Sequence, residues 1–383
     1  MRPLEDVRVV DFTEGAQGPF ATSLLADLGA EVVKVERPAG ELMRHVGPFA
    51  GGLALPMLSI ARGRHASLSI DVKTPAGRST ALQLVAAADL LIQNWKPGTD
   101  AKLGLSWEAV HAINPRLVYV RASGYGPHGP FGSMGAMDSL SSAIGGLSSL
   151  SGDPAGRGER MRTPILDFVS AFVAAEAALV GLAARRRHGR GTLVDTSQMA
   201  SALDAAAPEV AASAWGAVRP AGRTSRWSCF GGWFECSDGA WVSLECHDAA
   251  ELDAAALALG VADARPLGPA IARALRGIDA GAALERLRAA GLGAQPVRRQ
   301  FRPDVFDGYP GAIGVSHDAD AGEVRHPETP FAMSATPPRA GPPLGRIGRD
   351  DVWLDRLLDR WTRAAAVAAA ASSSPTLPDR SLR

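Results

Sequence analysis

The first third of the chain alternates short apolar runs with longer segments of mixed polarity. The runs at 7–12 (VRVVDF) and 31–36 (EVVKVE) are short and rich in valine, which predicts buried strands. Between them, the segment 19–28 begins with a proline and is followed directly by Gly29, a pattern typical of a helix. A strand, a helix and a second strand in so short a stretch form a βαβ unit, so we expect a parallel sheet.

The same alternation continues to about residue 123 and then changes. A helix is expected over 75–88 and leads into the apolar run ADLLIQNW, and the helix-like SWEAVHAIN leads into LVYVRAS. These repeated units predict an α/β fold, with a Rossmann-like open parallel sheet in a large domain. Residues 224–245 are instead rich in aromatic residues and turn signals, and they predict a hairpin that begins a smaller α+β domain.

These changes of pattern set the predicted domain boundaries. A proline-rich stretch at 326–345 predicts an extended crossing back to the first domain, and a helix is expected from 349 to about 371. The polar end of the chain is typical of a disordered tail. The predicted parts are a large domain (1–200, completed by 325–371), a linker (201–223), a small α+β domain (224–324) and a disordered tail (372–383).

Composition narrows the classes of function. The 383 residues include 40 basic and 40 acidic side chains, and 46% are hydrophobic, which argues against a disordered chain and against a dedicated nucleic-acid binder. The N-terminus has no apolar signal region. The apolar stretch 164–184 carries Asp167 and Glu176 in its interior, which argues against a membrane span. We therefore expect a cytoplasmic protein without membrane or nucleic-acid partners.

Several short sequence patterns do not indicate the functions with which they are usually associated, because their surroundings do not fit. Residues 124–129 match GxGxxG after a strand, but the adjoining prolines and the lack of a following helix argue against dinucleotide binding. The chain has no P-loop, nucleophile-elbow or HExxH motif. Its three cysteines lack CxxC spacing, which favours buried thiols over a disulfide framework or a metal site. We predict no bound metal.

Asp167 stands out near the start of the helix expected over 164–184. At about 100° per residue, large apolar side chains lie opposite Asp167, and we interpret them as the core contact. Its own face then has room for another backbone or a ligand. This pattern leaves two interpretations of Asp167 open: a functional carboxylate, or a surface carboxylate that the helix dipole favours. The residues that share its face are all small: Ser170, Ala171, Ala174 and Ala178.

Six segments, taken in order, resemble a known enzyme family. They are VRVVDFTEGAQGPFATSLLADLGAEVVKVERP, SIDVKTPAGR, NWKPGTDAKLGL, VRASGYGPHGP, RTPILDFVSAF and GRGTLVDTSQMASALD. The chain is similar in these segments to the class III CoA-transferases, the CaiB/BaiF family, which includes formyl-CoA, carnitine and bile-acid CoA-transferases. The resemblance implies a homodimer of interlocked rings. It also implies that CoA moves from an acyl-CoA to a carboxylic acid through an aspartyl anhydride and an aspartyl-CoA thioester, without a tightly bound cofactor.

The resemblance assigns site residues by position. Asp167 matches the family's catalytic aspartate, and Met137 and Asp138 stand where the family often has Tyr-Asp beside the acyl pocket. We add Gly231 and Gly232, on a predicted glycine-bearing loop, as candidate amide donors for developing oxyanions. The implied contacts with CoA are Gln17, Gly18, Arg37, Ile70, Asp71, Val72, Lys73, Asn94, Trp95, Lys96 and Lys102.

Two departures from the family pattern keep alternatives open. The family's Lys-Arg pair is replaced by His65-Ala66, so Arg62 and Arg64 become candidates for the CoA phosphates. The α-methylacyl-CoA racemases share the fold and use a histidine at the position of Met137, where a methionine cannot carry a proton. The alternatives to a transferase are therefore such a racemase or a catalytically altered acyl-CoA-binding protein.

Overall fold

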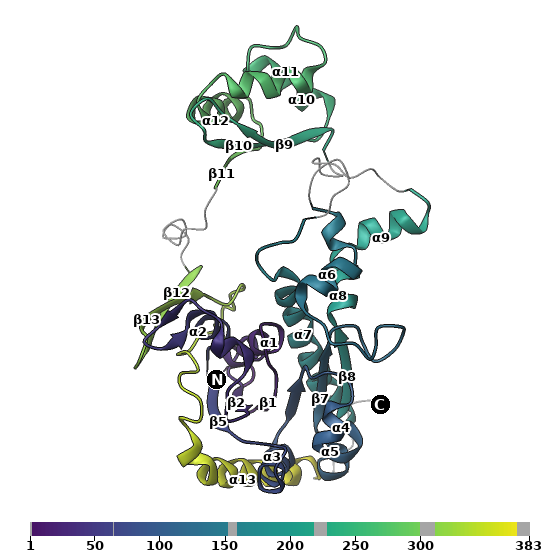
Figure 1. Cartoon of the computed structure of the whole chain (residues 1–383), viewed down its shortest axis with the longest axis vertical. Coiled ribbons are helices and arrows are strands. Elements are labelled where there is room, and N and C mark those ends of the chain that lie inside the picture. The colour runs from purple at the N-terminus through teal and green to yellow at the C-terminus, as the bar shows by residue number, and fades with distance from the viewer. Residues whose placement is uncertain (1, 64, 152–158, 218–227, 299–310, 374–383) are drawn as a thin grey trace, which may run out of the picture. The chain divides into compact units, whose positions relative to one another are not determined.

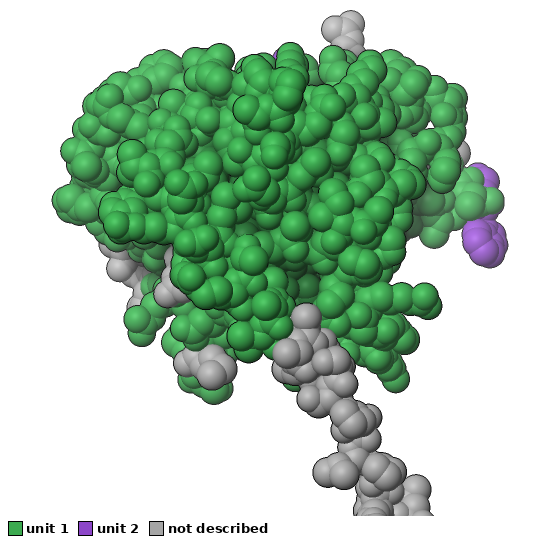
Figure 2. Space-filling view, turned by 90° about the horizontal axis from the view of Figure 1, so that it is seen from below, with its two compact units in different colours: residues 1–147, 161–214, 306–383 green, residues 148–160, 215–305 purple. Residues whose placement is uncertain are grey.

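The computed structural model describes residues 2–63, 65–151, 159–217, 228–298 and 311–373 (Figure 1). The chain forms two compact units, which Figure 2 colours separately. The larger unit comprises Met1–Leu147, Met161–Ala214 and Phe306–Arg383, and the smaller comprises Ser148–Arg160 and Trp215–Val305.

The larger unit is built on a six-stranded parallel sheet. In spatial order its strands are β5 (His65–Ser69), β2 (Glu31–Glu36), β1 (Arg8–Asp11), β6 (Leu90–Gln93), β7 (Val118–Ser123) and β8 (Thr192–Ser197). Numbered along the chain, this is the Rossmann order 3-2-1-4-5-6, in which the winding reverses between β1 and β6. The predicted α/β fold with a parallel sheet is confirmed.

Helices cover both faces of this sheet. One face carries α1 (Gln17–Asp27) and α7 (Ile165–His188), and the other carries α3 (Pro75–Ala87), α5 (Trp107–Ile113) and α13 (Leu354–Ser373). Trp361 of α13 is fully buried in the core of the second face. The C-terminal helix therefore completes the larger unit, where it lies beside α3 in Figure 1.

The packing of α7 overturns one interpretation of its sequence. The small residues that share the face of Asp167 are buried, and a Cβ added to Gly181 would lie 2.5 Å from Val118 Cγ1 of β7. The large face is the open one, since Phe172 and Val180 are 43% and 59% exposed. The prediction that the large residues make the core contact was wrong, because small side chains let α7 approach the sheet closely.

α7 is also long and apolar enough to cross a membrane, judged by length and composition alone. Half of its most apolar window is buried inside the protein. The helix packs against α1, β7 and β8, so it is a core helix of the larger unit.

The smaller unit has the α+β composition expected for it. Its antiparallel sheet has the order β11-β10-β9, and helices pack on the sheet through a core that includes Val242, Ile271 and Leu287. Its elements are β9 (Phe230–Glu235), β10 (Trp241–Cys246), α10 (Ala249–Ala258), α11 (Leu267–Arg276), α12 (Ala280–Ala289) and β11 (Ala294–Val297).

The two units differ from the predicted domain boundaries. The first part of the predicted linker 201–223 is helical, because an alanine-rich stretch follows a helix start at which Ser197 Oγ accepts from the N–H of Ala200. The end of the predicted small domain 224–324 belongs to the larger unit, where Val324 is buried in a hairpin beside α2. Most of the predicted tail 372–383 lies outside the described residues.

The remaining elements of the described residues are η1 (Leu42–His45), β3 (Phe49–Ala50), β4 (Leu53–Ala54), α2 (Leu55–Ile60), α4 (Thr99–Leu103), α6 (Asp138–Ile144), η2 (Leu147–Ser149), α8 (Gln198–Ala205), α9 (Ala207–Ala214), β12 (Ile313–Asp318), β13 (Gly322–Pro327) and η4 (Asp351–Trp353).

Candidate active site

The predicted CoA contacts all follow the carboxyl end of a strand in the larger sheet. In an open parallel sheet these ends form one edge, and ligands bind where the winding reverses, which here is between β1 and β6. The structure therefore brings the candidates to a single edge. Gln17 and Gly18 follow β1, Arg37 follows β2, Ile70, Asp71, Val72 and Lys73 follow β5, and Asn94, Trp95, Lys96 and Lys102 follow β6.

The loop between β1 and α1 is held from both sides by side chains. The Asn94 side chain accepts from the N–H of Glu14 at 2.8 Å and donates to the carbonyl of Glu14 at 2.7 Å. The buried Glu41 carboxylate accepts from the N–H of Gly15 at 2.8 Å. Asn94 thus positions the loop that begins α1, and its direct contact with CoA stays a prediction.

A fully buried lysine also binds the loop between β1 and α1. Lys34 Nζ donates to the carbonyl of Thr13 at 2.5 Å and lies 3.7 Å from Asp11 Oδ2. Burial by itself lowers the pKa of Lys34, but the carboxylates of Asp11 and Glu41 raise it above its usual value, so the amine stays charged. At Gly18 a Cβ would lie 2.1 Å from Thr13 Cβ, so only glycine fits at this turn of α1.

Asp167 lies in the first turn of α7, among the N-terminal ends of α6 and α8. Its backbone N–H donates to Asp138 Oδ2 at 3.0 Å, which caps a helix whose own N-cap residue provides no side-chain hydrogen bond. Gln198 Nε2 donates to Asp167 Oδ1 at 2.5 Å, and Ser141 Oγ donates to Gln198 Oε1 at 2.6 Å. Asp167 Oδ2 accepts no hydrogen bond from the described residues.

The surroundings of Asp167 change its acidity. Burial raises the pKa of Asp167 to about 6, and the negative charge of Asp138 adds to this rise. The hydrogen bond from Gln198 opposes it. At neutral pH the side chain is therefore ionised but poorly solvated, a state that suits a carboxylate nucleophile.

Two contacts join Asp167 to the edge that carries the CoA candidates. Phe20 of α1 packs edge-on against Phe168 of α7, with ring centroids 5.0 Å apart, so the first turns of these helices are neighbours. A Cβ on Gly135 would lie 2.8 Å from Lys96 Cε, which sets Lys96 against the loop that leads to Asp138. The segments that carry Asp167 and the predicted CoA contacts are therefore neighbours in the larger unit.

The residues predicted to contact the substrate are divided between the two units. Asp138 contacts Asp167, whereas Met137 is 61% exposed at the start of α6 and its part in a pocket stays a prediction. Gly231 and Gly232 belong to the smaller unit, where they pair with β10 in strand β9. The prediction that they lie in a loop was wrong, because pairing with β10 extends the strand through the glycines.

The suggestion that Arg62 replaces a missing phosphate contact was also wrong. Arg62 is completely buried, and its Nη2 lies 3.1 Å from Asp27 Oδ2 in an ion pair inside the larger unit. The Arg62 guanidinium is therefore paired inside the larger unit and is not exposed to bind a phosphate. Arg64, the other candidate, lies outside the described residues.

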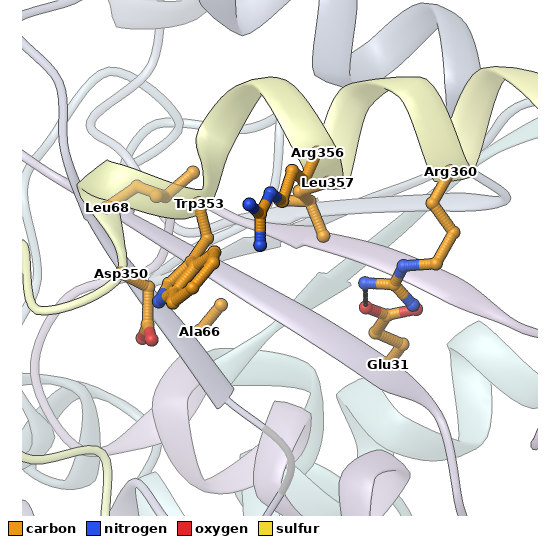
Figure 3. A pocket seen from close by; sticks show the side chains of 8 residues that line it. All are labelled: Glu31, Ala66, Leu68, Asp350, Trp353, Arg356, Leu357 and Arg360. Atoms are coloured by element: carbon orange, nitrogen blue, oxygen red, sulfur yellow. Dashed lines mark hydrogen bonds and ion pairs between the residues drawn. The ribbon is translucent and has the colours of Figure 1, made fainter.

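A separate cavity of about 320 Å³ lies between β5 and α13 (Figure 3). Within it the guanidinium of Arg356 lies 4.7 Å from the ring centroid of Trp353, and Arg360 pairs with Glu31. Glu31 is the first residue of β2, so this side of the cavity lies at the amino ends of the strands. The cavity is therefore distinct from the edge that carries Asp167.

Two residues of the site were missed from the sequence. Gln198 and Ser141 connect α8 and α6 to Asp167, although neither was singled out. A signal for Gln198 was present, because it directly follows β8 and residues after the carboxyl ends of parallel strands meet at one edge. Ser141 gave no such signal, since it is one of several serines in its segment.

Comparisons of the sequence with known proteins identify a family and several relatives. The sequence profile of CoA-transferase family III matches residues 4–350. The chain is 39% identical over 196 residues to succinyl-CoA–D-citramalate CoA-transferase of Chloroflexus aurantiacus, covering 51% of this chain and 48% of that protein. It is 36% identical over 203 residues to succinyl-CoA:glutarate CoA-transferase of Mus musculus, covering 52% and 46%. The chain thus spans about half the length of these curated relatives.

Solved structures share the fold over nearly the whole chain. A CaiB/BaiF family protein from Brucella suis has a TM-score of 0.83 at 23% identity, covering 94% of this chain and all of that chain. The orthorhombic crystal form of Rv3272 from Mycobacterium tuberculosis has a TM-score of 0.78 at 25% identity, covering 92% of this chain and 99% of that chain.

Proposed function

The chain belongs to CoA-transferase family III, and from this membership we propose that it moves coenzyme A from an acyl-CoA thioester to a carboxylic acid. The observation that carries the proposal is the half-buried Asp167 carboxylate, whose pKa is raised to about 6 by desolvation and by the charge of Asp138. One of its oxygens is held by Gln198, and the other accepts no hydrogen bond from the described residues. In this proposal CoA is a substrate, and no tightly bound cofactor is required.

In the proposed mechanism, Asp167 carries the acyl group and then CoA. Its Oδ2 attacks the thioester carbonyl, the C–S bond breaks, and CoA leaves as a thiolate to give a mixed anhydride. The thiolate attacks Cγ of Asp167, which releases the first acid as a carboxylate and leaves an aspartyl-CoA thioester. The acceptor carboxylate attacks the same carbon and frees the thiolate. The thiolate then attacks the acceptor's carbonyl, which restores Asp167 without net proton transfer.

A transfer assay tests this proposal directly. Purified protein with succinyl-CoA and a panel of carboxylic acids, analysed by mass spectrometry, is expected to yield the CoA ester of at least one acid. Succinyl-CoA is the first donor to test, because the names of the two curated relatives above contain it. Deuterium wash-in at the α-carbon without transfer would instead indicate a racemase. Binding without turnover of any donor would indicate an acyl-CoA-binding protein.

Arg37 and Lys73 are proposed to bind the phosphates of CoA. Both are exposed at the carboxyl edge of the sheet, and Arg37 Nε donates to the carbonyl of Gly40 at 2.7 Å, which orients its guanidinium. Because each charge-assisted contact contributes about 1–3 kcal/mol, alanine at either position is expected to raise KM for every acyl-CoA roughly 5- to 150-fold.

The preference among acceptor acids is expected to stay unchanged in both variants. Arg116 serves as a control, since it is a half-buried arginine at the opposite, amino end of β7, and Arg116→Ala is expected to leave KM unaltered. A change confined to one acid would show that the substituted residue lines the acyl pocket and would contradict the assignment.

We extend the proposal to a homodimer. The open face of α7 exposes Phe172, Leu179 and Val180, and a second copy of the chain would remove this apolar surface from water. Light scattering after size exclusion is expected to give twice the chain mass. If the copies interlock, dissociation is expected only together with unfolding, so a native monomer in dilute solution at equilibrium would contradict this arrangement.

A further inference from the structure

Gln198 makes two hydrogen bonds that leave its amide a single usable orientation. Gln198 is 5% exposed, and its side chain lies between the buried hydroxyl of Ser141 and the carboxylate of Asp167. An ionised carboxylate can only accept hydrogen bonds. The NH₂ group must therefore face Asp167, and Oε1 must face Ser141, whose hydroxyl donates to it.

We infer that Gln198, held by Ser141, positions the Asp167 carboxylate through Oδ1 and donates to the same oxygen when Asp167 is acylated. Donation to the acylated Asp167 rests on the proposed function, whereas the positioning of the carboxylate does not. With Oδ1 held, Oδ2 is the oxygen left to attack the thioester. The structure thus distinguishes the two oxygens of one carboxylate before any substrate binds.

The hydrogen bond from Gln198 to Asp167 Oδ1 also has a role later in the reaction. Once Oδ2 bears the acyl group, Oδ1 becomes the carbonyl oxygen of Asp167. Attack of the CoA thiolate on Cγ then moves an electron pair onto Oδ1, and collapse of the intermediate expels the first acid as its carboxylate. A donor already 2.5 Å from Oδ1 stabilises this charge without reorganisation.

The charged groups around Asp167 determine how strongly the hydrogen bond from Gln198 affects the pKa of Asp167. The negative charge of Asp138 on α6 opposes the ionisation of Asp167 and so raises its pKa. The other charged groups on the packed helices and strands are directed elsewhere: Arg121 of β7 pairs with Asp195 of β8, Asp27 of α1 pairs within the fold, and Asp204 of α8 is exposed. Removing the donor at position 198 therefore leaves the effect of Asp138 uncompensated.

The first experiment titrates Asp167 in the resting protein and needs no turnover. The carboxyl carbon is followed by ¹³C NMR against pH and assigned by its loss in Asp167→Asn. Gln198→Met keeps the length of the side chain and removes the donor, so the titration is expected to move up by about one pH unit. Gln198→Glu keeps an acceptor for Ser141 and adds a charge, and a larger upward shift is expected.

The second experiment measures transfer with the same variants. Loss of one oxyanion donor is expected to lower kcat about 10²- to 10³-fold in Gln198→Met, with KM for the acyl-CoA unchanged. The acidic limb of the pH–rate profile is expected to move upward with the titration. Ser201 is a matched control, because it is buried in the same helix and its hydroxyl donates to the carbonyl of Ser197. Ser201→Ala is expected to leave both readouts unchanged.

The outcomes separate this inference from the proposed function. An unchanged titration of Asp167 in both Gln198 variants, or an equal shift in Ser201→Ala, would overturn the inference even if the wild type transfers CoA. A wild type that shows the Gln198-dependent titration but transfers no CoA would support the positioning role and refute the proposed function. A fall in kcat without a titration shift would reduce Gln198 to a structural residue and would also overturn the inference.

Discussion

Asp167→Asn is expected to lower the rate of CoA transfer at least 10³-fold while leaving the affinity for CoA unchanged. An amide cannot form the anhydride or the thioester, because it is not a nucleophile at neutral pH. The substitution keeps the shape of the side chain and an oxygen that accepts from Gln198. The proposed contacts with CoA follow β5, β2, β1 and β6, whereas Asp167 begins α7, so binding is expected to survive.

The loss is measured by the transfer assay, and the binding of CoA by calorimetry. Asp359 is a matched control, because it is an exposed carboxylate on α13, which covers the opposite face of the sheet, and Asp359→Asn is expected to retain full activity. Hydroxylamine added during turnover of the wild type is expected to convert Asp167 to its hydroxamate, which peptide mass spectrometry detects. Substantial transfer by Asp167→Asn would show that Asp167 is not the nucleophile.

The same substitution is expected to stabilise the fold above pH 6 by about 1–3 kcal/mol. Burial and the charge of Asp138 raise the pKa of Asp167 to about 6 from the usual 3.8, so the ionised side chain destabilises the folded state at pH 8. As the pH falls from 6 to below 3.8, the carboxyl group becomes protonated and the wild type regains this stability. The advantage of the variant is therefore expected to disappear below about pH 4.

Chemical denaturation at a series of pH values measures this difference as a free energy of unfolding. Asp359→Asn again serves as the control, and it is expected to change the stability little at any pH, because the side chain of Asp359 is exposed. Equal stabilities of wild type and Asp167→Asn at pH 8 would contradict a destabilised carboxylate. A difference that increases as the pH falls would contradict the direction of the pKa shift.

The pattern of residues determined the local elements of the larger unit. Runs of valine and leucine marked β1, β2 and β6, and the segments between them marked α1 and α3 near their observed bounds. These predictions succeed because a short apolar run and a helical period depend on neighbouring residues only. Asp167 became a candidate in the same way, since it lies on a face of unusual composition and within a segment that resembles a family, and its catalytic role stays a prediction.

Only the tertiary structure decided which surfaces and side chains meet. The period of α7 separates two faces, but the small face packs inward because close approach to the sheet needs small side chains. Asn94 reaches Glu14 across 80 residues, and Gln198 reaches Asp167 across 31. No sequence period encodes such distances, because they follow from the order in which six parallel strands bring their carboxyl ends to one edge.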